Sequence, residues 1–327
     1  MATSDLGRLL RLNGDVSIDF ITSPALRDNP LGDPATRPLY VWSPGGDGPY
    51  PSVYMLQGFT GTAPAWFNVR AWEPSFPVVV EGLGLDVVVV LVDAFTSLGG
   101  SQFLDSPAIG NYHTYLCDEV VPWVDARYPT GRRALAGKSS GGFGAAVTAM
   151  LRPDLFSGFA THAGDALFDV TYRRAFVEAV RALRDAYGGS YEAFLEDFRS
   201  RRPLSKKTDH ALIEMWAMSA AYSGGELPFD TATAAVREDV FERWLAWDPV
   251  RLAESRTEAL RGMRAVWIDA GRGDEFFLDV GAAAFRRAVA AAGVPDEIVH
   301  FELHEGGHFD TAWRYPLSLR HLVERLA

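Results

Sequence analysis

The 327-residue chain is poor in cysteine and lysine, with Cys117 as its one cysteine and lysine only at positions 138, 206 and 207. A single cysteine excludes an internal disulfide and a cysteine-based metal site. The longest apolar run, Val87–Val92, is far too short to span a membrane. Residues 1–14 lack the apolar core of a signal peptide, so we expect a cytoplasmic protein without a membrane partner.

Positive charge is also scarce, because 31 basic residues face 42 acidic ones and leave a net charge of −11. A surface of that sign repels phosphate backbones, so we expect no nucleic-acid partner. Hydrophobic residues make up 48% and charged residues 22%, values typical of a globular protein, which excludes a disordered chain or a fibre. The length is compatible with one α/β domain that spans residues 1–327, and a homo-oligomer is compatible with the sequence.

Short β-branched runs alternate with helical patterns along the chain. Residues 85–92 (LDVVVVLV) are apolar at nearly every position, which is typical of a strand buried on both faces. The alternation predicts an α/β fold with a mostly parallel central sheet flanked by helices. The predicted strands are 16–22, 38–42, 52–56, 85–92, 133–136, 157–162, 265–269 and 297–303, and the predicted helices 112–127, 142–151, 280–292 and 311–326.

No strand pattern occurs between Asp165 and Met263. Helical patterns are found there at 171–187, 191–199, 211–222 and 231–247. We expect a helical insertion, 165–263, over one end of the sheet and within the single domain. Its aromatic and methionine residues favour a wall of a substrate pocket; the alternative is that they only pack the insertion onto the sheet.

The segment Gly137-Lys-Ser-Ser-Gly141 has the pattern G-x-S-x-G between a predicted strand and a predicted helix. A sharp strand-to-helix turn exposes the central serine, and side chains two residues before and after it would collide. This context predicts Ser139 as a nucleophile; the alternative is a glycine-rich turn with an incidental serine. A phosphate-binding loop would need glycine at position 132, where Arg132 stands.

A serine nucleophile needs a histidine as base and an acid that orients the histidine. After a serine on such a strand-to-helix turn, the acid comes next along the chain and the histidine comes last. His308 follows the last predicted strand in a Gly-Gly loop and is the preferred base, with His162 as the alternative. Asp274 lies past its strand after two glycines and is the preferred acid. Glu275 is the fallback, and Asp269 lies within the strand.

The literal H-E-x-x-H of residues 304–308 would bind zinc only if it formed a helix. Its two central glycines and the strand pattern before it argue against a helix, so we expect no metal and no metalloprotease.

An oxyanion hole needs two N–H donors. We expect one from Ser140, which follows the nucleophile, and one from Phe59 in the loop after an earlier strand.

These motifs resemble the esterase D-like branch of the α/β-hydrolases, which includes S-formylglutathione hydrolases. The matching segments are LQGFTGT (56–62), NYHTYLCDEVVPWVDARYP (111–129), GKSSGGFGA (137–145), IDAGRGDEFFLD (268–279) and EGGH (305–308). The resemblance implies Ser139, Asp274 and His308 as a triad, with Phe59 and Ser140 as oxyanion donors. At two of these segments, S-formylglutathione hydrolases resemble LSGLTCT and GHSMGG. These differences argue against a glutathione thioester as the substrate, but they leave the implied triad unchanged.

We therefore expect a serine carboxylesterase that acts on a small-molecule ester through an acyl-enzyme and needs no cofactor. The candidate pocket walls are Trp66, Phe67, Trp216 and Phe276, which could equally be core aromatics. The alternatives are an S-formylglutathione hydrolase-like thioesterase, an acyltransferase with the same triad, and a non-catalytic binding protein on the same fold.

Overall fold

A computed structural model describes residues 15–68 and 74–327, so the expectation for residues 1–14 lies outside the described part of the chain. Its main sheet has eight strands in the order β1-β2-β4-β3-β7-β8-β9-β10. Strands β1 and β2 pair antiparallel, as do β2 and β4, and every other pairing is parallel. The strands are β1 (Asp15–Thr22), β2 (Thr36–Ser43), β3 (Tyr50–Leu56), β4 (Val88–Val92), β7 (Thr130–Lys138), β8 (Gly158–His162), β9 (Ala265–Gly271) and β10 (Val299–His304).

Alternate residues of the central strands feed two apolar clusters, one on each face of the sheet. In β4, Val88, Val90 and Val92 belong to the larger cluster, whereas Val89 and Leu91 belong to the other. Every residue of this strand is buried. The continuous apolar run therefore reflects burial on both faces, as the sequence predicts.

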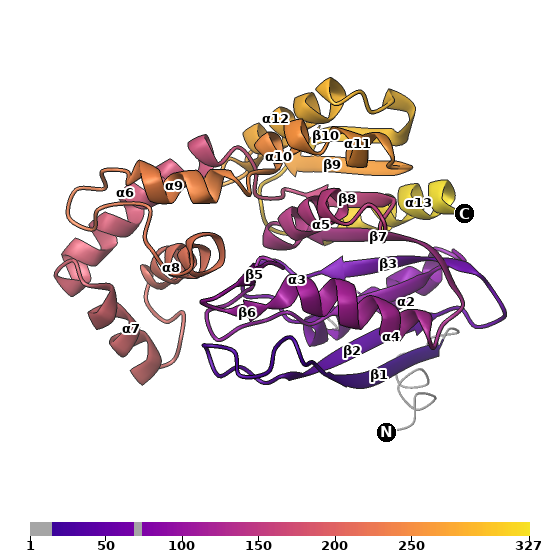
Figure 1. The fold of residues 1–327 in the computed structure, drawn as a ribbon, viewed down its shortest axis with the longest axis horizontal. Coiled ribbons are helices and arrows are strands. Elements are labelled where there is room, and N and C mark those ends of the chain that lie inside the picture. Colours follow the sequence, from indigo (N-terminus) through magenta and orange to yellow (C-terminus); the bar gives the residue numbers. More distant parts are fainter. Residues whose placement is uncertain (1–14, 69–73) are drawn as a thin grey trace.

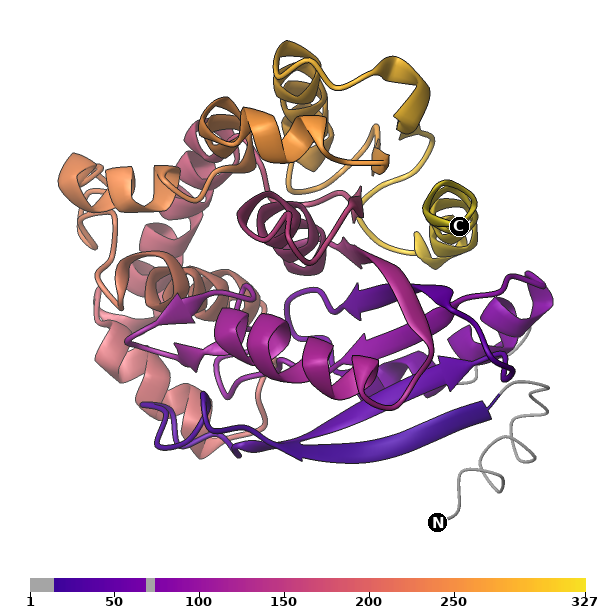
Figure 2. The same cartoon turned by 45° about the vertical axis from the view of Figure 1, so that its right-hand side comes forward.

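Helices cover both faces of the sheet. Figure 2 shows the yellow C-terminal helix α13 and the magenta helix α5 on opposite sides of the sheet. The helices outside the connection between β8 and β9 are α2 (Phe76–Gly82), α3 (Tyr112–Thr114), α4 (Val121–Asp125), α5 (Ser140–Leu151), α12 (Leu278–Ala291) and α13 (Tyr315–Leu326). Between α3 and α4 the chain forms a π-helix, Tyr115–Val120, so the predicted helix 112–127 is continuous but not regular.

Six helices occupy the connection between β8 and β9, where the sequence predicts a helical insertion. They are α6 (Phe168–Tyr187), α7 (Tyr191–Ser200), α8 (Asp209–Ser223), α9 (Glu238–Leu245), α10 (Pro249–Ser255) and α11 (Thr257–Arg261). Helices α6 to α9 project beyond one end of the sheet, whereas α10 and α11 lie beside α12 and β9 (Figure 1). None of the helices within 15–68 and 74–327 is long and apolar enough to cross a membrane.

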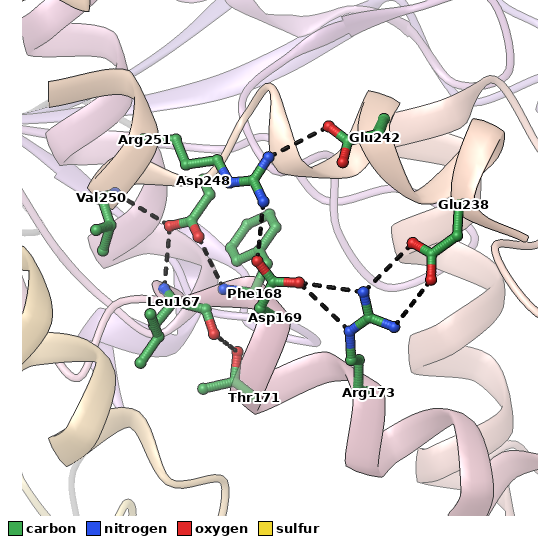
Figure 3. Close-up of polar contacts among 10 residues, drawn as sticks. All are labelled: Leu167, Phe168, Asp169, Thr171, Arg173, Glu238, Glu242, Asp248, Val250 and Arg251. Carbon is green, nitrogen blue, oxygen red and sulfur yellow. Dashed lines mark hydrogen bonds and ion pairs between the residues drawn. The ribbon is translucent and has the colours of Figure 1, made fainter. Parts of the chain in front are cut away.

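One carboxylate joins the start of this connection to the start of α10. Asp248 accepts hydrogen bonds from the backbone N–H groups of Leu167 (3.0 Å) and Phe168 (2.9 Å) at the start of α6. It also accepts one from Val250 (3.0 Å) at the start of α10 (Figure 3). Because N–H groups in the first turn of a helix have no partner within the helix, Asp248 caps both helices and fixes where α6 leaves the sheet.

Candidate active site

Ser139 stands on a sharp turn between β7 and α5. Its backbone has φ 56° and ψ −127°, a left-handed conformation that strains a residue with a side chain. Its N–H donates to the carbonyl oxygen of His162 (2.9 Å), and its own carbonyl accepts from Phe143 N–H (2.9 Å). A Cβ at Gly137 would lie 2.4 Å from the carbonyl of Gly141. The two glycines are therefore required by close backbone packing, as the motif predicts.

His308 and Asp274 meet where β10 and β9 end. His308 Nδ1 lies 2.8 Å from Asp274 Oδ2, and the two residues are only 4% and 5% exposed. The other carboxylate oxygen of Asp274 accepts from the N–H groups of Phe276 (2.9 Å) and Leu278 (3.2 Å). The Asp274 carboxylate is thus held on both oxygens, and one of them contacts the imidazole.

Backbone hydrogen bonds join the loops that carry these two residues. Arg272 N–H donates to His304 (2.9 Å), and Gly273 N–H donates to Gly306 (2.8 Å). Glu275, the fallback acid, instead accepts the backbone N–H of His308 through its carboxylate (2.6 Å). Glu275 therefore binds the backbone of the loop that carries His308, whereas Asp274 contacts the imidazole.

Ser139 and His308 line one cavity of about 620 Å³, which lies between the carboxyl ends of the parallel strands and helices α6 and α8. Phe59 lines it as well. A Cβ at Gly58 would lie 3.1 Å from the Lys138 carbonyl oxygen, so the Phe59 loop packs directly against the turn that carries the serine. Glycine at position 58 is what allows this approach.

Two backbone donors near Ser139 are free to bind a substrate oxygen. Among the hydrogen bonds of residues 15–68 and 74–327, neither Phe59 N–H nor Ser140 N–H has an acceptor. Ser140 is the first residue of α5, where free N–H groups and the positive end of the helix dipole coincide. Their arrangement is compatible with the predicted oxyanion hole.

The insertion supplies a polar wall to the cavity, not the aromatic wall expected from its composition. Asp165, His210 and Glu214 all line it. Burial raises the pKa of Asp165 to about 6. Burial, with the charges of Asp165 and Glu178 as lesser causes, raises the pKa of Glu214 to about 8. None of these residues was expected in the site from the sequence, although His210 and Glu214 are one helical turn apart and so share a helix face.

Of the four predicted pocket aromatics, the structure brings only Phe276 to the cavity, where its ring lies 4.8 Å from the ring of His308. The other three are not among the residues that line it. Trp66 packs on Phe76 (4.5 Å), Phe67 on Tyr40 (5.0 Å) and Trp216 on Tyr191 (5.1 Å), all as ring-centroid distances. Their aromatic area is used in packing against the core clusters.

His162, the alternative base, is buried away from this cavity. Its Nδ1 lies 2.7 Å from Asp269 Oδ1 and its Nε2 lies 2.9 Å from the hydroxyl of Ser318. Both ring nitrogens are therefore used inside the core. The other oxygen of Asp269 accepts from Trp267 Nε1 (2.7 Å) and Arg314 Nε (2.8 Å).

Residues 304–308 do not form a helix, because β10 ends at His304 and Gly306 has φ 121°. His304 Nδ1 lies 2.9 Å from the carbonyl oxygen of Glu305. Within the described ranges, no group of three or more His, Cys, Asp or Glu side chains is placed to hold a metal ion.

Comparisons with known proteins give the family of this chain. A family model described as "Putative esterase" matches residues 36–322, which is most of the chain. The chain belongs to this esterase family. As a member of it, the protein is an ester-hydrolysing enzyme with an α/β-hydrolase fold. No curated protein matches the chain.

Solved structures of similar fold cover nearly the whole esterase. A ferulic acid esterase is 21% identical with a TM-score of 0.58, over 96% of this chain and 98% of that one. An S-formylglutathione hydrolase from Agrobacterium tumefaciens is 16% identical with a TM-score of 0.61, over 97% of each chain. A fluorophosphonate-binding serine hydrolase of Staphylococcus aureus is 15% identical with a TM-score of 0.56, over 94% and 97%. At these identities the likeness shows the fold alone.

Proposed function

We propose that this esterase is a serine carboxylesterase that hydrolyses small to medium carboxylic esters through an acyl-enzyme. Ser139 attacks the ester carbonyl while His308 takes its proton, and Asp274 holds the imidazole in the tautomer that can accept it. The N–H groups of Phe59 and Ser140 stabilise the oxyanion. His308 then protonates the leaving alcohol, and water repeats the cycle on the acyl-enzyme.

The observation that carries this proposal is the buried 2.8 Å hydrogen bond between His308 and Asp274 beside a cavity that Ser139 also lines. The strained conformation of Ser139 supports the assignment, because such strain concentrates at functional sites. Free backbone donors on the Phe59 loop and at the start of α5 add a place for the developing negative charge.

The test compares Ser139→Ala with Ser318→Ala on a panel of p-nitrophenyl esters of rising chain length. Ser318 is a matched control, since it also contacts a histidine that contacts an aspartate, but it is fully buried. Ser139→Ala is expected to lower kcat on the order of a millionfold, whereas Ser318→Ala retains hydrolysis. Substantial activity in Ser139→Ala would contradict the proposal.

Thioesters and an added alcohol belong in the same panel. Faster turnover of a glutathione thioester would favour the thioesterase alternative. A dominant transfer product in the presence of the alcohol would favour an acyltransferase, because the same acyl-enzyme serves both reactions.

A further inference from the structure

Two polar side chains of helix α8, His210 and Glu214, line the cavity although the proposed chemistry does not use them. His210 Nδ1 lies 3.5 Å from Glu214 Oε2. The ring of His210 packs edge-on against Phe59 (5.8 Å between centroids) and lies 6.0 Å from the ring of Phe276. Because Phe276 also packs against His308, the pair on α8 faces the proposed catalytic groups across the cavity.

The other carboxylates of the cavity wall already have partners. These contacts join Asp165 to Gln102 and Tyr172, Glu178 to Arg174, and Glu275 to the backbone N–H of His308. In the part of the chain that the structure describes, the side chains of His210 and Glu214 make no hydrogen bond beyond their long mutual contact. Glu214 is nevertheless only 21% exposed. The side chain of His210 is 45% exposed, so burial bears on Glu214 alone. Since buried polar groups are normally hydrogen-bonded, the unused capacity of the Glu214 carboxyl group is directed at what fills the cavity, with His210 beside it.

The surroundings of the pair favour neutral forms of both groups. Burial, and next the charges of Asp165 and Glu178, raise the pKa of Glu214 to about 8, which favours its protonated form at neutral pH. Burial, and next the charge of His308, lowers the pKa of His210. A carboxylic acid and a neutral imidazole together offer donors and acceptors without a net charge. Such a pair suits an uncharged hydroxyl group better than an ion.

We propose that His210 and Glu214 form a recognition site for a neutral hydroxyl group of the ester substrate, so that hydroxylated esters are preferred to their alkyl or unsubstituted counterparts. This inference rests on the proposed function and names the substrate class of that same site. A site built to hydrogen-bond a substrate hydroxyl discriminates because a substrate without it leaves the buried polar groups unpaired.

The test measures kcat/KM for two matched ester pairs. Glycerol monobutyrate against propyl butyrate places the hydroxyl groups on the alcohol side, and methyl p-hydroxyphenylacetate against methyl phenylacetate places one on the acyl side. The wild-type enzyme is expected to prefer the hydroxylated ester about tenfold in at least one pair. Glu214→Leu is expected to reduce that preference about threefold to tenfold, whereas Glu214→Gln retains it because the amide still donates and accepts.

Two further variants complete the design. His210→Phe keeps the ring but removes the polar atoms, so it also lowers the preference, and it supplies the comparison if Glu214→Leu does not fold. Glu196→Leu makes the matched change on an exposed position of α7 outside the cavity and leaves both the preference and the rates unchanged.

Equal use of both members of each pair by the wild-type enzyme would overturn the inference, and so would a preference that survives both Glu214→Leu and His210→Phe. Loss of the preference in Glu214→Gln would also contradict it, because an amide, like a neutral carboxylic acid, can both donate to and accept from a hydroxyl group. In all these cases Ser139-dependent hydrolysis still stands. If no ester in the set is hydrolysed in a Ser139-dependent way, the proposed function itself fails, and the inference with it.

Discussion

The Asp274→Asn variant tests whether the Asp274 carboxylate orients the imidazole of His308 or only supports its own loop. Asp274 Oδ1 accepts two backbone N–H groups, and its Oδ2 receives His308 Nδ1 at 2.8 Å. An asparagine places its single oxygen toward the two N–H donors, because the reverse orientation would set its own NH₂ against them. Its NH₂ group then faces His308 Nδ1, which must give up its proton. The imidazole is left protonated at Nε2 and cannot act as a base toward Ser139.

The expected loss follows from that tautomer change. We expect kcat to fall about ten-thousandfold, as wrong-tautomer variants of such triads do. The free energy of unfolding should fall by only about 1–2 kcal/mol, since a buried charge-assisted hydrogen bond becomes a neutral one. Steady-state hydrolysis of a p-nitrophenyl ester, beside thermal unfolding, measures both quantities.

Glu275→Gln is the matched control, because its amide oxygen can still accept His308 N–H, and we expect it to lower kcat less than about tenfold. A folded Asp274→Asn enzyme that keeps more than about a tenth of wild-type kcat would refute the reasoning. A greater loss in Glu275→Gln than in Asp274→Asn would move the acid to Glu275.

Three further outcomes follow from buried contacts. Gly141→Ala would place a Cβ 2.2 Å from the Leu56 carbonyl oxygen, so thermal unfolding should show a loss of at least about 1–3 kcal/mol. Asp248→Ala removes the acceptor of three backbone N–H groups and should lower the free energy of unfolding by roughly 2–4 kcal/mol. It should also raise KM, because α6 is no longer fixed beside the cavity. Asp248→Asn should lie between Asp248→Ala and the wild type in both quantities. Burial raises the pKa of Asp165 to about 6, so the folded protein holds this proton up to about pH 6, whereas the unfolded chain loses it near the ordinary aspartate pKa of 3.8. Stability should therefore fall by about 3 kcal/mol as the pH rises from about 4 to about 6, and denaturant unfolding of Asp165→Asn should lack this component; equal slopes in both proteins would contradict it.

The eight strands of the main sheet could be predicted because most of them combine β-branched residues with turn signals at their ends. β7 is the exception, because its predicted part (133–136, RALA) has no β-branched residue, and the observed strand extends from Thr130 to Lys138. Helices α2, α10 and α11 are absent from the predicted helices, and α9 starts later than predicted. Helix α2 (FPVVVEG) is short and rich in valine, so its local pattern resembles a strand. The predicted helix 231–247 begins only at Glu238, because the Asp230 side chain accepts the N–H groups of Ala232 and Thr233 and closes a local turn instead.

The triad candidates were accessible to sequence analysis because each follows a strand end in a loop with a distinctive composition. The residues of the insertion that line the cavity could not be identified from the sequence, because they depend on which face of a helix is turned toward the cavity. On α8, Trp216 lies two residues after Glu214 and so points about 200° around the helix from it. Periodicity separates these two faces, but nothing in the sequence indicates that the face with Glu214 meets the cavity while the face with Trp216 packs on Tyr191.

Besides the proposed triad, the protein contains another set of Ser, His and Asp side chains, which shows that hydrogen bonds alone do not identify a catalytic triad. Ser318, His162 and Asp269 are joined at 2.9 and 2.7 Å, as close as the 2.8 Å between the imidazole and carboxylate of the proposed triad. Yet Ser318 is fully buried and lies within a regular helix, with its hydroxyl bonded to a backbone carbonyl. A substrate cannot reach it, and the arrangement joins α13 to the sheet. In the described ranges no hydrogen bond joins Ser139 to His308, but Ser139 lines a cavity and lies on a strained turn beside free backbone donors. Its accessibility and these donors, and not a histidine contact, support it as the nucleophile that we propose.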